Sequence, residues 1–239
     1  MNVEDLRRRW DDRAGANPRF HIRADRSDWT DDAFLDSGEA DVAHFVDPVL
    51  DLVAERGAAL DVGCGLGRLS RALSSRFDHV HAVDISPVMI SGARSFTPPP
   101  PSNIVFSVCP GDGSLPIDTR SIDFAFSYLV FQHLPSVALM RSSLHDLARV
   151  LVPRGIARLQ FNGRHRSLAD RCSVGIVPSD RVPVVHRKPR LRVDPHDHMG
   201  AVLTARRAGR MAHRAGLDVL AIEGAGSAEL WLTLRAPRR

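Results

Sequence analysis

The sequence has few cysteines, a single lysine and no long apolar run. Its cysteines, Cys64, Cys109 and Cys172, are widely spaced among 239 residues and form no metal-binding or redox motif. A disulfide framework is therefore not expected, and a reducing cytoplasm is the predicted location. No apolar stretch approaches the roughly 20 residues that cross a bilayer, and the charged first residues do not resemble a signal peptide. Lys188 is the only lysine, so almost all of the basic charge is arginine.

The net charge is small for a chain of this size. The sequence has 32 Lys and Arg residues against 28 Asp and Glu residues, a formal net charge of +4. Because the excess is mild and scattered, it does not by itself indicate nucleic-acid binding. With 44% hydrophobic and 25% charged residues, the composition is that of a globular protein. The length suits one large α/β domain, alone or with a cap.

Short apolar segments alternate with helical patterns through the middle of the chain. Strands are predicted at 59–62, 79–83, 104–108, 122–127 and 156–161. Strands that alternate with helices indicate a parallel, doubly wound sheet. After a helix predicted at 205–215, two strands at 217–222 and 230–234 read as a hairpin, which makes one edge of the sheet antiparallel.

The chain divides into two predicted parts. Residues 1–56 are expected to form a helical cap, and residues 57–239 the α/β domain. Within the cap, Pro18 ends a first helix and Pro48 predicts a kink or break in a second apolar stripe. Residues 162–203 fit no regular element, and we expect this insertion to cover the active site.

A glycine-rich loop, LDVGCGLG at residues 60–67, follows the first predicted strand. Glycines let the backbone pass close to a ligand because no Cβ intervenes. A loop between a strand and a helix is also where open α/β sheets bind nucleotides. Asp84 ends the second strand, where a carboxylate can accept hydrogen bonds from ribose hydroxyls. Asp112 follows the third strand, where it can reach an adenine amino group.

Taken in order, these segments resemble the class I S-adenosylmethionine (SAM)-dependent methyltransferases of small-molecule type. LDVGCGLG resembles their first motif, HAVDIS the acidic second-strand motif, PGDGSLP the adenine-contact loop, IDFAFSYLVFQHL the fourth-strand motif and LARVLVPRG the turn before strand five. WDDRAGANP and WTDDAFLDSG resemble the N-terminal cap of a bacterial subgroup.

The resemblance implies a Rossmann-like, seven-stranded sheet of order 3-2-1-4-5-7-6 with an antiparallel last strand. It also implies SAM as cofactor, S-adenosylhomocysteine as product and a small-molecule acceptor with an O, N or C nucleophile. It implies no particular oligomeric state. The implied cofactor contacts are Asp61, Gly63, Cys64, Gly65, Gly67, Asp84, Ile85, Asp112, Gly113 and Ser127.

Two alternatives stay open beside methyl transfer. An NAD(P)-dependent oxidoreductase is less favoured, because its G-x-G-x-x-G fingerprint would place a glycine where Arg68 stands. A catalytically inactive SAM-binding protein of the same fold is the other alternative. DNA is not an expected substrate, because Ser127-Tyr128-Leu129-Val130 replaces the Asn/Asp-Pro-Pro-aromatic motif that holds a flipped base.

His133 is the predicted general base, because it follows the fourth strand and histidine titrates in the useful pH range. The structural alternative is a hydrogen-bonded histidine that positions the next helix. Tyr128 and Gln132 are expected to line the acceptor pocket. The aromatic residues of the cap are expected either to close over the site or to pack on the sheet; they are Trp10, Trp29 and Phe34.

The 162–203 insertion is rich in arginine, and Arg187 is a predicted substrate contact. Arginine recognises carboxylate or phosphate by paired hydrogen bonds, which suggests an anionic acceptor. The alternative is a solvated loop whose arginines maintain solubility. The histidines of this insertion match no zinc-site spacing, so no metal is expected; they are His186, His196 and His198.

Overall fold

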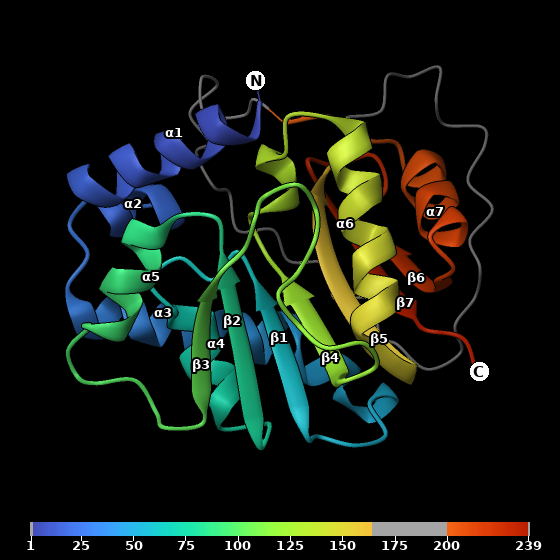
Figure 1. Cartoon of the computed structure of the whole chain (residues 1–239), viewed down its shortest axis with the longest axis horizontal. Coiled ribbons are helices and arrows are strands. Elements are labelled where there is room, and N and C mark those ends of the chain that lie inside the picture. Colours follow the sequence, from blue (N-terminus) through green and yellow to red (C-terminus); the bar gives the residue numbers. More distant parts are fainter. Residues whose placement is uncertain (1, 164–199, 239) are drawn as a thin grey trace.

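Seven strands form one sheet in the order β3-β2-β1-β4-β5-β7-β6 in the computed structural model, which describes residues 2–163 and 200–238 (Figure 1). The strands are β1 (Ala58–Val62), β2 (His79–Asp84), β3 (Ile104–Val108), β4 (Ile122–Ser127), β5 (Leu151–Asn162), β6 (Asp218–Glu223) and β7 (Glu229–Arg235). The first five strands are parallel, and β7 pairs antiparallel with both β5 and β6. The predicted order and the antiparallel last strand are therefore confirmed.

The predicted strand bounds are close except at β5, which begins at Leu151 rather than at residue 156. Pro153 and Gly155, which the sequence resemblance places in the turn before strand five, lie inside this strand. The pairing with β4 is irregular here, and Arg154 has a φ of 68°. Such an irregularity accommodates proline, which cannot donate to a strand ladder. The Arg154 N–H donates to the Ala236 carbonyl just beyond β7 (3.1 Å), so this segment extends the sheet.

The cap is helical, as predicted, and its prolines act where expected. The first helix ends just before Asn17, and Pro18 is the first residue of the next helix. Asn17 caps that second helix by accepting a hydrogen bond from the Phe20 N–H (3.3 Å). Pro48 marks the break between a long helix and a short 3-10 helix. The elements are α1 (Val3–Ala16), α2 (Pro18–Ile22), α3 (Asp31–Phe45) and η1 (Asp47–Leu52). None of the helices in the described part of the chain has the length and apolar composition to cross a bilayer.

Helices cover both faces of the sheet. The remaining helices are α4 (Arg68–Ser74), α5 (Pro87–Arg94), η2 (Phe131–His133), α6 (Val137–Val150) and α7 (Ala205–Arg214). One core cluster joins α3, α4 and α5 to one face of the sheet, and another joins α6 and α7 to the opposite face. Figure 1 shows α6 and α7 in front of the sheet, with α3 and α4 behind it. This is the doubly wound arrangement predicted from the alternating pattern.

Helix α1 lies across the carboxyl ends of the central strands. The Arg7 guanidinium donates to the carbonyls of Ile85 (3.3 Å) and Pro110 (2.9 Å), which follow β2 and β3. The Ser86 hydroxyl, which caps α5, donates to the Asp11 carboxylate (2.5 Å). Ligands of open α/β folds bind at this edge of the sheet, so α1 closes it from above.

Gly38 allows α3 to pack directly on α4. A Cβ at this position would lie 2.4 Å from the backbone oxygen of Arg68. We expect Gly38→Ala to lower the free energy of unfolding by about 1–3 kcal/mol, because the overpacked atom is backbone. Gly15→Ala is the matched control. A Cβ at Gly15, in α1, would have no other atom within 4 Å. We therefore expect this variant to raise the free energy of unfolding by about 0.5–1 kcal/mol. Urea unfolding of both variants measures this; equal effects of the same sign would contradict it.

Candidate functional site

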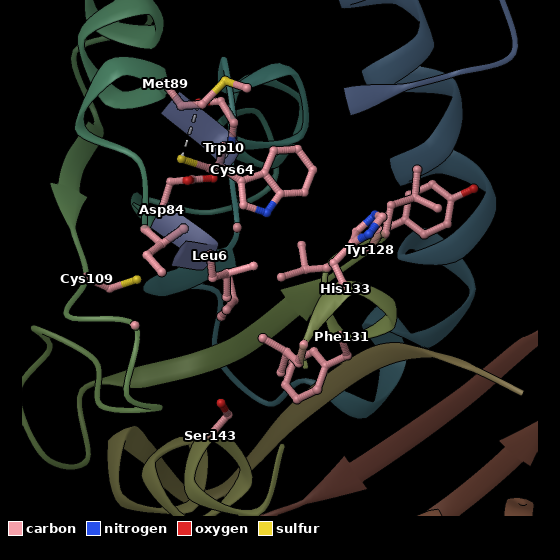
Figure 2. Close-up of a pocket in the computed structure, with 18 of the residues that line it drawn as sticks. Leu6, Trp10, Cys64, Asp84, Met89, Cys109, Tyr128, Phe131, His133 and Ser143 are labelled. Atoms are coloured by element: carbon pink, nitrogen blue, oxygen red, sulfur yellow. Dashed lines mark hydrogen bonds between the residues drawn. The ribbon is translucent and has the colours of Figure 1, made fainter. Parts of the chain in front are cut away.

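A pocket opens at the carboxyl ends of the central strands, between the cap and the sheet (Figure 2). Five segments line it: the cap, the glycine loop with the start of α4, the ends of β2 and β3, the segment after β4, and one face of α6. The lining residues are Leu6, Trp10, His21, Ile22, Val62, Gly63, Cys64, Gly65, Arg68, Leu69, Asp84, Ile85, Met89, Cys109, Gly111, Gly113, Ser114, Leu115, Tyr128, Leu129, Val130, Phe131, His133, Leu134, Leu139, Ser143 and Leu147.

The glycine loop presents bare backbone to this pocket. The N–H groups of Gly63 and Cys64 donate to the Val83 carbonyl (2.7 and 3.0 Å), which holds the loop against β2. Gly65 has a φ of 53°, and a Cβ there would lie 2.7 Å from the Ile22 side chain of the cap. Only glycine adopts this conformation without strain. The loop is therefore a cradle that a side chain would fill, which fits a ligand held against the backbone.

Asp84 connects this loop to the end of β2. One carboxylate oxygen accepts from the Gly65 N–H and the other from the Ser86 N–H, both at 2.9 Å. The side chain is buried at the pocket wall, and burial raises the pKa of Asp84 above its ordinary value. A carboxylate has about four acceptor positions. Two therefore remain for ligand hydroxyls, the role predicted for a ribose contact.

Asp61 lies beneath the loop rather than at the pocket wall. One of its oxygens accepts from the Ser70 hydroxyl (2.6 Å), and the other has no hydrogen-bond partner among the described residues. Burial raises the pKa of Asp61 to about 6. Gly67 also stays off the pocket wall, because it packs on Phe106; a Cβ at Gly67 would lie 2.9 Å from that ring. For both residues, direct contact with the cofactor stays a prediction.

The other predicted cofactor residues divide into two groups. Asp112 is exposed, and its carboxylate accepts from the N–H and hydroxyl of Ser114 (2.9 and 2.6 Å). Ser127 is buried and donates to the Val62 carbonyl (3.0 Å), which ties β4 to β1. Neither is a pocket-lining residue in this structure. Those that do line the pocket are Gly63, Cys64, Gly65, Asp84, Ile85 and Gly113.

The predicted base meets an aromatic residue of the cap. The rings of Trp10 and His133 lie edge to face, with centroids 5.3 Å apart, and both line the pocket (Figure 2). His133 Nε2 lies 3.2 Å from the Gln132 side-chain nitrogen, and Gln132 itself is buried behind it. Tyr128 lines the pocket and stacks on Trp231 (5.3 Å); burial raises the pKa of its hydroxyl. Of the predicted catalytic and acceptor residues in the described chain, Trp10, Tyr128 and His133 line the pocket, whereas Gln132 does not.

Two cap aromatics lie elsewhere. Trp29 and Phe34 contact one another edge to face (6.0 Å), and Phe34 stacks on Phe96 (6.2 Å). Together with Leu66 and Met89 they belong to a separate apolar cluster. Neither Trp29 nor Phe34 lines the pocket, so packing accounts for both.

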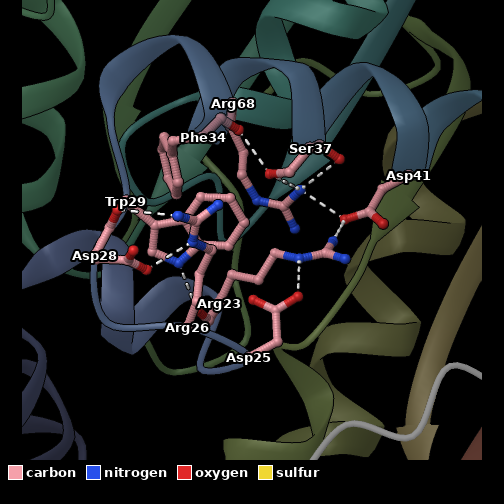
Figure 3. A network of polar contacts seen from close by, with 9 residues as sticks. All are labelled: Arg23, Asp25, Arg26, Asp28, Trp29, Phe34, Ser37, Asp41 and Arg68. Carbon is pink, nitrogen blue, oxygen red and sulfur yellow. Dashed lines mark hydrogen bonds and ion pairs between the residues drawn. The ribbon is translucent and has the colours of Figure 1, made fainter.

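Sequence reasoning missed the buried charge network beside the pocket. Arg68 donates to the Asp41 carboxylate (2.6 Å) and to the Ser37 carbonyl (3.2 Å). The same Asp41 oxygen also accepts from Arg23, which in turn pairs with Asp25 (3.0 Å) (Figure 3). From the sequence, Arg68 indicated only that the dinucleotide fingerprint is incomplete. No local pattern predicts a pair separated by 27 residues.

Most of the predicted 162–203 insertion, with Arg187 and its histidines, lies outside the described residues. The described ends are anchored: the Leu203 N–H donates to the Asn162 carbonyl (2.9 Å), and the Ala201 N–H to the Leu134 carbonyl (3.3 Å). The insertion therefore leaves and rejoins the sheet at the pocket's edge. Among residues 2–163 and 200–238, no three His, Cys, Asp or Glu side chains gather as a metal site.

Comparison with known proteins identifies the domain. Residues 60–159 match the family described as Methyltransferase domain. A malonyl-[acyl-carrier protein] O-methyltransferase from Salmonella typhimurium is 32% identical over 116 residues, which cover 47% of this chain and 43% of that protein. The chain spans less than half the length of the curated relatives that it matches.

Solved structures show the same fold at low sequence identity. The [4+2]-cyclase SpnF has a TM-score of 0.63 at 16% identity, and the match covers 100% of this chain and 97% of that one. A SAM-dependent methyltransferase from Aquifex aeolicus has a TM-score of 0.56 at 16% identity, with coverage of 87% and 99%. The chain therefore carries a methyltransferase domain in the fold of the class I SAM-dependent methyltransferases, and SAM is the cofactor that this domain implies.

Proposed function

We propose that this protein transfers the methyl group of SAM to a small acceptor held between the cap and the carboxyl ends of the strands. The observation that carries the proposal is the Asp84-tethered glycine loop, whose bare backbone faces a pocket closed by α1. Gly63 and Gly65 would cradle the cofactor, and Asp84 would accept from its ribose. The bound cofactor supplies an electrophilic methyl group on a sulfonium. The protein's part is to align the acceptor, exclude water and move a proton.

The described lining supports an acceptor that is largely apolar. Beyond the glycine loop the wall is made mainly of apolar side chains, among them Trp10, Phe131, Leu134 and Leu139. The cationic side chain at the wall, Arg68, is already paired with Asp41. The anionic acceptor suggested by the sequence depends on arginines outside the described residues. A carrier-bound acyl group belongs in an acceptor panel, because the Salmonella relative is named for one.

His133 is our proposed general base for acceptors that must lose a proton. We expect His133→Ala to lower kcat roughly a hundredfold with SAM affinity preserved, because proton transfer by a positioned side chain contributes about that factor. His79→Ala is the control, since His79 is exposed at the opposite end of β2. Steady-state kinetics over a pH series measures this. A lower melting temperature with unchanged kcat per folded molecule would make His133 a structural residue instead.

Calorimetry combined with a transfer assay tests the proposed function. We expect SAM and S-adenosylhomocysteine to bind and NADH not to bind. Radiolabelled methyl transfer is then followed across neutral, acidic and carrier-bound acceptors. NADH binding in place of SAM would overturn the proposal. Tight SAM binding without transfer to any class of acceptor would make the chain a SAM-binding protein of this fold.

A further inference from the structure

Helix α7 carries an unusual concentration of positive charge on its solvent face. Its sequence, ARRAGRMAHR, contains no acidic residue. One face is buried in the core through Ala208, Met211 and Ala212. The opposite face is exposed and defines what we call the α7 arginine face: Arg206, Arg207, Arg210, His213 and Arg214.

The α7 arginine face gathers four arginines on one helix that have no salt bridge to another described residue, whereas several arginines elsewhere in the fold are neutralised. Arg68, Arg76 and Arg149 each pair with a carboxylate. By contrast, no salt bridge or side-chain hydrogen bond joins an arginine of the α7 face to another described residue. The neighbouring helix α6 adds exposed Arg141 and His145, and its one acid, Asp146, is paired with Arg149.

This arrangement works against the stability of the helix itself. Arg206 and Arg207 lie in the first turn, where the positive end of the helix dipole disfavours cations. Arg206, Arg210 and Arg214 follow at four-residue intervals, where like charges repel. His213 and Arg214 in the last turn suit the dipole, so local helix stability accounts for the end of the row but not for Arg206, Arg207 and Arg210. A partner of opposite charge accounts for them.

The position of the face relates it to the pocket. Leu203, just before α7, is hydrogen-bonded to Asn162 at the carboxyl end of β5, and Ala201 to Leu134 at the pocket wall. The row of arginines thus begins at the edge of the sheet that holds the pocket. It then runs about 12 Å along α7, the helix that lies beside α6 in Figure 1.

Apolar residues beside the arginines favour a protein over a nucleic acid as the partner. Val202 precedes α7 and is 48% exposed, and Ile222 of β6, 37% exposed, lies against Gly209 of α7. Arginine next to exposed apolar surface is typical of protein interfaces. Single-stranded nucleic-acid sites instead pair basic residues with exposed aromatic side chains, and α7 has no Phe, Tyr or Trp.

We propose that the α7 arginine face docks an acidic partner protein that carries the methyl acceptor as a covalently attached group and presents it to the pocket. The presentation of the attached acceptor to the pocket, which we call delivery, rests on the proposed methyl transfer, whereas the docking of the partner does not. Complementary charge at such a surface steers association and sets orientation. The apolar pocket wall then receives the attached group, while the partner's acidic surface stays outside.

The test compares a charge-reversal variant with a matched control. In the first, Arg206, Arg207 and Arg210 become Glu; carboxylates in the first turn suit the helix dipole, so we expect this variant to fold. In the control, Arg56, Arg120 and Arg154 become Glu. These residues are exposed near the amino ends of the parallel strands and carry the same change in charge. Melting temperature and SAM affinity are measured for both.

The probe is the malonyl-loaded acyl carrier protein of the acceptor panel, with a free malonyl thioester as the small counterpart. We expect the α7 variant to weaken carrier binding at least tenfold and to reduce its salt dependence, with SAM affinity unchanged. Turnover of a free acceptor should also be unchanged in the α7 variant. If the proposed methyl transfer itself fails, the wild-type protein will not turn over the free acceptor either, so the two failures can be distinguished.

Three outcomes would overturn the docking proposal. The wild-type protein could fail to bind the carrier even at low salt, or both variants could lose binding equally, which would indicate unspecific charge attraction. An RNA or DNA duplex could bind more tightly than the carrier and lose binding in the α7 variant, which would assign the face to nucleic acid. Carrier binding with methyl transfer only to free acceptors would overturn delivery.

Discussion

Replacing Asp41 by alanine is expected to destabilise the folded protein by about 3–5 kcal/mol, the cost of removing one partner from a buried ion pair. The Arg68 side chain is only 2% exposed and the Asp41 side chain 9%. Asp41 also bonds Arg23, so the substitution removes the shared counterion of two guanidinium groups. The residue left with an uncompensated buried charge is Arg68, whose Nε is already buried without a hydrogen-bond partner among the described residues.

Urea unfolding of Asp41→Ala measures this loss. The matched control is Asp28→Ala, which breaks an exposed pair with Arg26 in the same region of the cap; we expect it to change stability little, because solvent screens that pair. The double variant Arg68→Met with Asp41→Leu should recover much of the stability, since apolar residues often replace a buried pair without loss. A small effect of Asp41→Ala alone would show that Arg68 reaches water.

Asp84→Ala is expected to weaken SAM binding by about 2–4 kcal/mol, roughly 30- to 1000-fold in Kd, through the loss of charge-assisted hydrogen bonds to the ribose. The structure adds a second effect that the sequence did not indicate. Because the carboxylate accepts from the N–H groups of Gly65 and Ser86, its removal leaves two buried donors unpaired. We therefore expect lower stability as well as weaker binding.

Calorimetric titration with SAM, at a temperature where each variant is folded, separates the two effects. Asp84→Asn keeps the side-chain volume and one acceptor oxygen, so it should lose less stability than the alanine variant while still binding SAM weakly. Asp78→Ala is the control, because Asp78 is exposed just before the other end of β2. Unchanged SAM affinity in folded Asp84→Ala would remove Asp84 from the cofactor site.

The order of the elements and the glycine loop after the first strand could be predicted from the sequence. Alternating apolar segments, the glycine loop and Asp84 are local signals, because strand and helix periodicity and the freedom of glycine depend on a few neighbouring residues. The same holds for Ser86 as the cap of α5 and for Pro48 as a break. The expected turn at Pro153 does follow the end of α6 at Val150, but pairing with the neighbouring strands makes Pro153 part of β5.

The tertiary structure decided which residues meet. Asp61 lies in the glycine-loop motif and Asp84 at the end of β2, but only Asp84 reaches the pocket wall. Trp10 meets His133 and Arg68 meets Asp41 because α1 and α3 pack on elements far along the chain. Such contacts depend on how helices sit on the sheet, and no periodicity encodes them. The sequence by itself determined the fold and its glycine loop, and packing determined the charge network and the wall of the pocket.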